Sequence, residues 1–166
     1  MEFLADLHPI VVHFPIAILT LYVFIEIFGI SMNKEFLMKM AHLLLFIGIV
    51  TAIGAVLTGN QAAEVADQVN KSNLNYPNEI IEDHETYASI TLWLFAGLLV
   101  LRTYLVLKKK FIGILRYIFI PLTIIGLYFI YETGNYGGKL VFDYGVGTEL
   151  FKNTESSTDS LKQINK

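Results

Sequence analysis

The sequence contains no cysteine and few charged residues. Without cysteine the chain can form no disulfide, no thiolate ligand for an iron–sulfur cluster and no C-x-x-C-H attachment of a c-type haem. Any metal or cofactor must therefore be held by histidine, carboxylate or backbone ligands. Charged residues make up 16% of the 166 residues, hydrophobic residues make up 54%, and the mean hydropathy is +0.55. A soluble domain of this size could not bury so much apolar surface, so the composition indicates an integral membrane protein.

Most of the hydrophobic residues fall in four apolar runs, at residues 10–30, 37–58, 87–107 and 111–131. Each run has about 20 residues, which as a helix is about 30 Å long and matches the hydrocarbon core of a bilayer. The sequence therefore predicts an all-α fold, an integral membrane four-helix bundle. We expect one transmembrane domain over residues 1–150, with its first helix retained, and a polar, disordered tail over residues 151–166.

Lysine and arginine are concentrated at one end of the predicted bundle. The turn after the first run has Lys34 and Lys39, and the turn between the last two runs has three consecutive lysines and Arg116. The connection between the second and third runs has one basic residue, Lys71, among six acidic ones. Because cytoplasmic loops retain positive charge, both termini and this connection should lie on the outer side. With the basic residues at one membrane face and a net charge of −3, we expect no nucleic-acid binding.

Two stretches on the predicted outer side are too polar to span the membrane. One has small apolar residues at helical spacing: Ala62, Val65, Ala66 and Val69. This spacing predicts a short amphipathic helix lying over the bundle. The other is a glycine-rich segment after the fourth helix, in which Gly134, Gly137 and Gly138 lead into an alternating stretch at residues 139–147. We expect this segment to fold at the outer interface.

Three of the four histidines converge on the predicted outer rim of the bundle. His8 and His13 lie at the outer end of the first helix and His84 at the outer start of the third, whereas His42 lies near the cytoplasmic end. Ionisable groups within a membrane span are commonly functional, so a shared pocket for imidazoles from two helices is expected. The alternative is that His8 caps its helix and His13 anchors at the lipid headgroups.

The first helix should be kinked near its outer end. Pro15 has no amide hydrogen to donate to the carbonyl of Val11, and its ring crowds that carbonyl. Residues five apart differ by about 140° around a straight helix, so His8 and His13 should not face the same side unless the kink rotates them. We therefore do not pair these two histidines with each other.

A second polar cluster is expected in the cytoplasmic half. Glu26, His42 and Arg102 each lie four or five residues inside the membrane from the ends of three different helices. An unpaired charge at that depth is costly, so Glu26 and Arg102 should either pair inside the bundle or extend separately to the interface. His42 could join such a network, but it has no second histidine at its depth.

Several short motifs occur together along the chain. They are the opening LHPIVVHFPIA at residues 7–17, Thr58-Gly59, His84, and TGNYGGKLV at residues 133–141 followed by GVG. This combination, over residues 4–150, resembles the bacterial membrane family catalogued as domain of unknown function 2231, whose members are predicted four-helix proteins. The resemblance implies a multi-pass protein of the bacterial inner membrane. Because some relatives are fused to Rieske iron–sulfur or cytochrome c domains, it also implies a respiratory context with a Rieske-type or cytochrome c-type partner.

A b-type haem is the most specific chemistry that these residues suggest. A haem needs apolar walls, axial ligands from facing helices and small residues where it approaches the backbone. We expect His13 and His84 to be the axial ligands, with His8 beside them at the rim. Gly137 and Gly138 would allow close approach of the macrocycle. This chemistry indicates an electron carrier or a subunit more than a stand-alone enzyme.

Two other functions stay open at this point. One is a bare zinc or copper ion held by imidazoles and carboxylates, drawn from His8, His13, His84, Asp6, Asp83 and Glu85. The other is a non-catalytic membrane subunit that docks a redox partner through its outer loops.

Overall fold

The structure is a computed structural model that describes residues 2–70 and 78–146, and it is all helical over this part of the chain. The helices are α1 (Glu2–Val11), α2 (His13–Ser31), α3 (Glu35–Asn70), α4 (Asn78–Leu107), α5 (Ile114–Tyr117) and α6 (Phe119–Phe142). They form four segments long and apolar enough to cross a membrane, namely Leu4–Ser31, Glu35–Ala66, Asn78–Leu107 and Ile114–Phe142. The predicted four-span, all-α architecture is confirmed.

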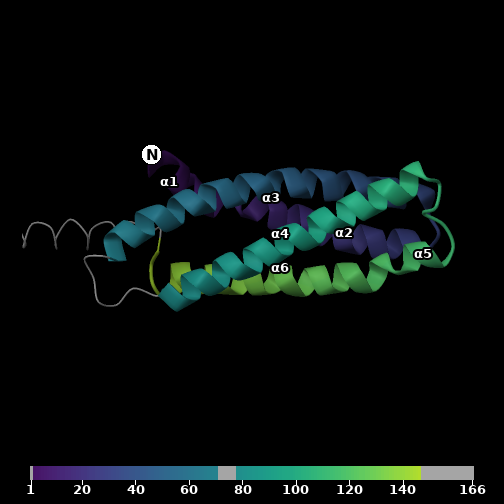
Figure 1. The fold of residues 1–166 in the computed structure, drawn as a ribbon. Coiled ribbons are helices and arrows are strands. Elements are labelled where there is room, and N and C mark those ends of the chain that lie inside the picture. Colours follow the sequence, from purple (N-terminus) through teal and green to yellow (C-terminus); the bar gives the residue numbers. More distant parts are fainter. Residues whose placement is uncertain (1, 71–77, 147–166) are drawn as a thin grey trace, which may run out of the picture.

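The four spans form an elongated bundle with two distinct ends (Figure 1). At one end, the lysine end, lie the turn at residues 32–34 and the turn at residues 108–113. At the other, the histidine end, lie the N-terminal helix α1, the beginning of α4 and the end of α6. The two limits of the described chain therefore lie at the same end of the bundle. Which membrane face that end occupies remains a prediction from the charge distribution. The predicted tail at residues 151–166 lies outside the described residues.

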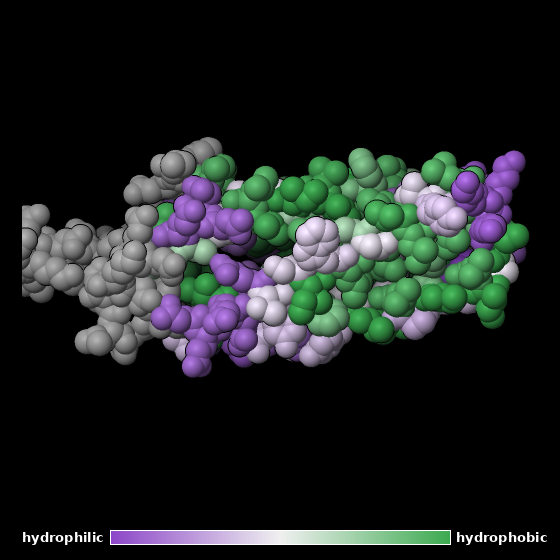
Figure 2. Space-filling view, in the orientation of Figure 1, coloured by the Kyte–Doolittle hydropathy of each residue, from purple (hydrophilic) through white to green (hydrophobic). Residues whose placement is uncertain are grey.

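The surface between the two ends is largely apolar. Figure 2 shows a hydrophobic belt along the bundle with hydrophilic residues gathered at the ends. Large side chains on this belt are highly exposed, among them Trp93 at 75% and Val100 at 70%. Exposure of so much apolar surface to water would be unfavourable, whereas its contact with lipid tails is favourable.

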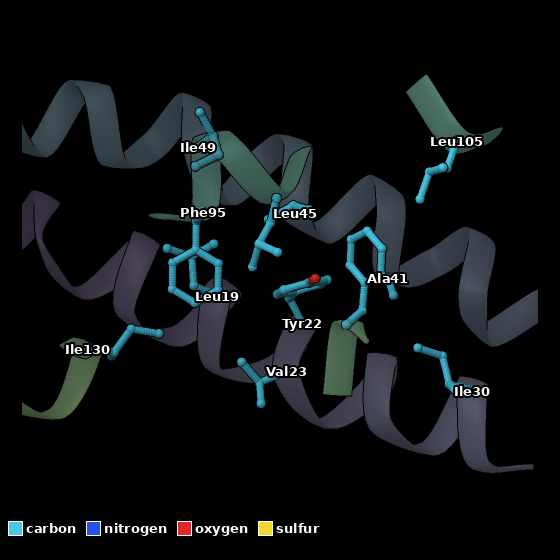
Figure 3. Packing of buried hydrophobic residues seen from close by; sticks show 12 residues of the cluster. Leu19, Tyr22, Val23, Ile30, Ala41, Leu45, Ile49, Phe95, Leu105 and Ile130 are labelled. Atoms are coloured by element: carbon cyan, nitrogen blue, oxygen red, sulfur yellow. The ribbon is translucent and has the colours of Figure 1, made fainter. Parts of the chain in front are cut away.

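The core lies between the crossing helices (Figure 3). Tyr22 of α2 and Phe95 of α4 are fully buried and meet edge to face, with ring centroids 5.9 Å apart. Gly126 of α6 makes room for this contact, because a Cβ at that position would lie 2.5 Å from Cζ of Phe95. Gly48 of α3 makes room for Leu19 of α2 in the same way, because a Cβ there would lie 2.4 Å from Cδ2 of Leu19.

The first span is interrupted at Val12, where α1 ends and α2 begins. The Val12 amide still donates to the carbonyl of His8 at 3.1 Å, but Pro15 has no amide hydrogen to donate to Val11. The interruption lies within the region where the sequence predicts a kink. Both α1 and α2 pack on α3, and Leu4–Ser31 remains one continuous candidate span.

Two helices continue beyond the limits expected from the sequence. The stretch around Ala62 and Ala66 is not a separate helix lying over the bundle but the continuation of α3, which runs to Asn70. Gly134, Gly137 and Gly138 do not follow the fourth helix but lie inside α6, which runs to Phe142. Hydropathy marks where a helix leaves the apolar region, whereas backbone hydrogen bonding continues into the polar residues beyond it. Residue 147 of the expected interfacial stretch lies outside the described residues.

Candidate cofactor site at the histidine end

His8 extends from α1 towards α3 and is held there by Thr58. Nδ1 of His8 lies 3.0 Å from Oγ1 of Thr58. The Thr58 hydroxyl is also placed to donate to the carbonyls of Gly54 and Ala55, at 3.2 and 3.0 Å. When its proton is donated within α3, its oxygen can accept from Nδ1–H of His8. This tautomer leaves Nε2 as the nitrogen that carries the lone pair.

His84 is fixed in the same tautomer by a different kind of partner. Its Nδ1 lies 3.0 Å from the backbone carbonyl oxygen of Thr133 on α6. A carbonyl can only accept, so Nδ1 of His84 carries the hydrogen and Nε2 of the neutral ring carries the lone pair. The hydroxyl of Thr133 also lies 3.1 Å from that of Thr91, which ties α6 to α4 beside the histidine.

A glycine lies directly against each of these two imidazoles. A Cβ on Gly59 of α3 would be 3.0 Å from Cε1 of His8, and a Cβ on Gly137 of α6 would be 3.1 Å from Cε1 of His84. A residue larger than glycine at either position would therefore take up space that the imidazole now occupies. Gly137 was expected to approach a cofactor, but here it contacts the histidine. Gly138, half-buried, has open space where a Cβ would be added.

The two imidazoles come from separate helix pairs and meet between them. His8 belongs to the pair α1 and α3, and His84 to the pair α4 and α6. The ring centroids lie 6.5 Å apart, with the rings inclined at 77°. At this end α3 and α4 diverge (Figure 1), and the surface is hollowed between them (Figure 2). The arrangement brings one imidazole from each helix pair together at the histidine end of the bundle.

His13 does not take part in this arrangement. Its side chain is exposed, and its Nδ1 lies 2.6 Å from the carbonyl of Pro9 in its own span. The structure thus brings His8, and not the preferred His13, beside His84. The sequence reasoning was right that the two histidines of the first span face different sides, but it selected the one that points outward.

The carboxylates considered for a bare metal site are not gathered around the pair. Within residues 2–70 and 78–146, no group of three or more histidine, aspartate or glutamate side chains could hold a metal ion. Asp83 and Glu85 flank His84 in sequence, but both are exposed. Tyr87 of α4 stacks on Tyr136 of α6, with ring centroids 5.2 Å apart.

The residues that form this site all lie in a segment shared with known sequences. A family model described as "Predicted membrane protein (DUF2231)" matches residues 5–150. The chain belongs to this family. The resemblance inferred from the short motifs is therefore confirmed. No curated protein and no solved structure matches the chain.

The predicted polar cluster is present in the other half of the bundle. Glu26 Oε1 and Arg102 Nη1 form an ion pair, and both side chains are buried, at 0% and 1% exposure. Nη2 of Arg102 donates to the carbonyl of Met38 at 2.6 Å, which connects α4 to α3. The guanidinium also lies over the ring of Phe111, 4.5 Å from its centroid. Glu26 and Arg102 therefore pair inside the bundle and do not extend separately to the interface.

His42 lies beside this pair but is not bonded into it by its ring nitrogens. Its Nε2 is 3.4 Å from the hydroxyl of Thr103, the neighbour of Arg102 in sequence, and the side chain is half-buried. The interactions of the ion pair are therefore the contact of Glu26 with Arg102 and the hydrogen bond from Arg102 to the Met38 carbonyl.

Sequence reasoning missed the residues that hold the two imidazoles. Thr58, Gly59 and Thr133 appeared only as parts of motifs. A signal was present, because a Thr-Gly pair stands in two different spans, at Thr58 and at Thr133, on the part of each span towards the histidine end. One supplies a hydroxyl oxygen and the other a carbonyl oxygen to a histidine of the neighbouring helix.

Proposed function

We propose that the protein binds a b-type haem through His8 and His84 and carries electrons in a bacterial inner membrane. The observation that supports this most is the pair of imidazoles from facing helix pairs, with Nδ1 of each within hydrogen-bond distance of a protein oxygen. The proposal keeps the predicted cofactor and replaces His13 by His8. The histidine end would lie on the outer side, where a Rieske-type or cytochrome c-type protein could exchange electrons with the haem.

The way each imidazole is held is typical of a metal ligand. A ligating histidine commonly donates its second ring N–H to a protein oxygen, which fixes the tautomer and the orientation of the ring. Thr58 supplies that oxygen to His8, and the Thr133 carbonyl supplies it to His84. In the neutral form of each ring, such a bond at Nδ1 leaves Nε2 as the ligating nitrogen.

The number of donors favours haem over a bare metal ion. Zinc in proteins is generally bound by three or four protein ligands, whereas haem iron already has four porphyrin nitrogens and needs only axial ones. In the described part of the chain, no third metal-ligating side chain joins His8 and His84 into such a group. Two neutral imidazoles therefore fit an axial pair better than a complete zinc site.

A haem would have to enter between the two helix pairs, which diverge at this end (Figure 1), away from the core contact of Tyr22 and Phe95. A bound haem would supply a one-electron redox couple. The chain itself would orient the ring through the two histidines and exclude water with the apolar faces of the spans.

The absorption spectrum of the purified full chain tests this proposal. We expect a Soret band in the oxidised protein, a sharp α-band after reduction with dithionite, and porphyrin recoverable by acid extraction. Elemental analysis of the same sample should give iron in proportion to porphyrin. Colourless protein with stoichiometric zinc or copper would overturn the haem proposal in favour of a bare metal site. Colourless, metal-free protein that still binds a redox partner would overturn it in favour of docking alone.

A further inference from the structure

The buried ion pair is surrounded by polar atoms that have no hydrogen-bond partner. In the described part of the chain four buried side-chain nitrogen or oxygen atoms lack one, and three belong to this group: Oη of Tyr22, Oε2 of Glu26 and Nε of Arg102. The fourth, Nε of Arg116, is at the lysine end. Tyr22, Glu26 and Arg102 are each at most 1% exposed. Buried polar groups are nearly always satisfied, so three together in one place require an explanation.

These three atoms belong to one site. Tyr22 and Glu26 are one helical turn apart on α2, and so lie on the same face of that helix. Glu26 and Arg102 are joined through their other atoms, Oε1 and Nη1. The three unsatisfied atoms therefore belong to the two side chains of the ion pair and to a tyrosine on the same face of α2 as Glu26.

The donors and acceptors of the site are complementary to a single small molecule. Arg102 Nε–H is a donor, Glu26 Oε2 is an acceptor, and the Tyr22 hydroxyl can donate or accept. A water molecule can accept from two donors and donate to one acceptor at the same time. A buried water typically makes about three hydrogen bonds to groups that would otherwise be unsatisfied.

We propose that Tyr22, Glu26 and Arg102 bind an internal water molecule within the membrane-spanning core. The water completes a hydrogen-bonded chain from the Tyr22 hydroxyl through Glu26 and Arg102 to the Met38 carbonyl, which joins α2, α4 and α3. It also gives the Glu26 carboxylate a partner for proton exchange in a region that lipid and apolar side chains otherwise seal from solvent. This site is independent of the haem proposed at the histidine end.

Nuclear magnetic resonance of the arginine side chains can detect this water. The chain has two arginines, Arg102 and Arg116, so detergent-solubilised protein labelled with ¹⁵N-arginine gives two Nε–H signals. The variant Arg116→Lys removes one signal and so assigns the other to Arg102. We expect a cross-peak between Arg102 Nε–H and the water resonance, although the side chain is 1% exposed.

The variant Tyr22→Phe separates water from direct contact with the tyrosine hydroxyl. The ring is retained, and a bound water would keep Arg102 and Glu26 as partners, so the cross-peak should persist. Absence of the cross-peak in the native protein would overturn the proposal. A cross-peak that disappears in Tyr22→Phe would also overturn it, because the hydroxyl and not water would then be its source.

Discussion

Thr58 holds His8 from a neighbouring helix, and its hydroxyl oxygen lies 3.0 Å from Nδ1 of the imidazole. The same hydroxyl is within hydrogen-bond distance of the carbonyls of Gly54 and Ala55. One side chain can therefore donate to a carbonyl within α3 and accept from Nδ1–H of His8 at the same time. The orientation of His8 towards His84 depends on this contact and on the absence of a side chain at Gly59.

Replacement of Thr58 by valine tests the role of that contact in cofactor binding. Valine keeps the shape of the side chain but offers no oxygen to Nδ1 of His8. Loss of an outer hydrogen-bond partner commonly weakens metal binding by about 10- to 100-fold, and we expect haem affinity to fall within that range. The measurement is haem titration of the extracted apoprotein, followed by absorption.

Thr51→Val is the matched control for that variant. Thr51 lies on the same helix, and its hydroxyl donates to carbonyls of its own helix, those of Ile47 and Gly48. It has no contact with either histidine of the site among these bonds, so haem affinity should be unchanged. Equal losses in Thr51→Val and Thr58→Val would contradict a specific role for the hydroxyl beside His8.

A methyl group at Gly59 should displace the imidazole of His8. The added Cβ would be 3.0 Å from Cε1 of the ring, which is too close unless the ring moves by a few tenths of an ångström. We expect Gly59→Ala to reduce haem occupancy and to change the low-spin absorption spectrum. The variant Gly54→Ala, on the same helix with nothing within 4 Å of its new Cβ, should leave the spectrum unchanged. It should also stabilise α3 by up to about 1 kcal/mol, since alanine is the better helix former.

The ion pair of Glu26 and Arg102 should show strong coupling in a double-mutant cycle. Each single change, Glu26→Gln or Arg102→Gln, leaves a charge unpaired in the core, and breaking a buried pair costs about 3–5 kcal/mol. The double variant should therefore lose less stability than the sum of the two, by more than about 1 kcal/mol. Unfolding in detergent measures this coupling, and additive losses would show that the two side chains do not interact.

Glu35 and Lys39 provide a comparison for that cycle. They form an exposed pair one helical turn apart on α3, at 2.8 Å. Exposed pairs are screened by water and salt, so the same cycle on Glu35→Gln and Lys39→Gln should give no measurable coupling.

The number of spans and the depth of the polar residues could be predicted from the sequence. Apolar runs of bilayer length identify the four spans, and distance along a run gives the depth at which Glu26 and Arg102 lie. Depth alone was enough to group these two residues. Whether they pair depends on which sides of α2 and α4 face each other, and this is determined by packing around residues such as Phe95 and Gly126.

The depth of a residue does not indicate which side of its helix faces the bundle. His8 and His13 lie at similar depths, and only one of them can face the bundle. His8 has the contact with Thr58 and the space left by Gly59, neither of which hydropathy indicates. The ends of α3 and α6 were misplaced for a related reason: glycine and polar residues end the apolar signal but not the helix.

Labelling with a membrane-impermeant reagent tests the orientation of the bundle. Among single-cysteine variants of this cysteine-free chain, one at Lys109 in the 108–113 turn should stay unlabelled in intact cells. One at Glu82, near the beginning of α4, should be labelled. Labelling at Lys109 but not at Glu82 would place the histidine end in the cytoplasm.

The most direct test of the central claim compares three histidine variants in one spectroscopic measurement. His8→Ala and His84→Ala should each lose the bound haem or convert it from its low-spin form, because each removes one of two facing imidazoles. His13→Ala should keep the native spectrum, since that side chain is exposed and bonded to Pro9 of its own span. A native spectrum in His8→Ala, together with its loss in His13→Ala, would contradict the assignment of His8 and His84 as the ligands.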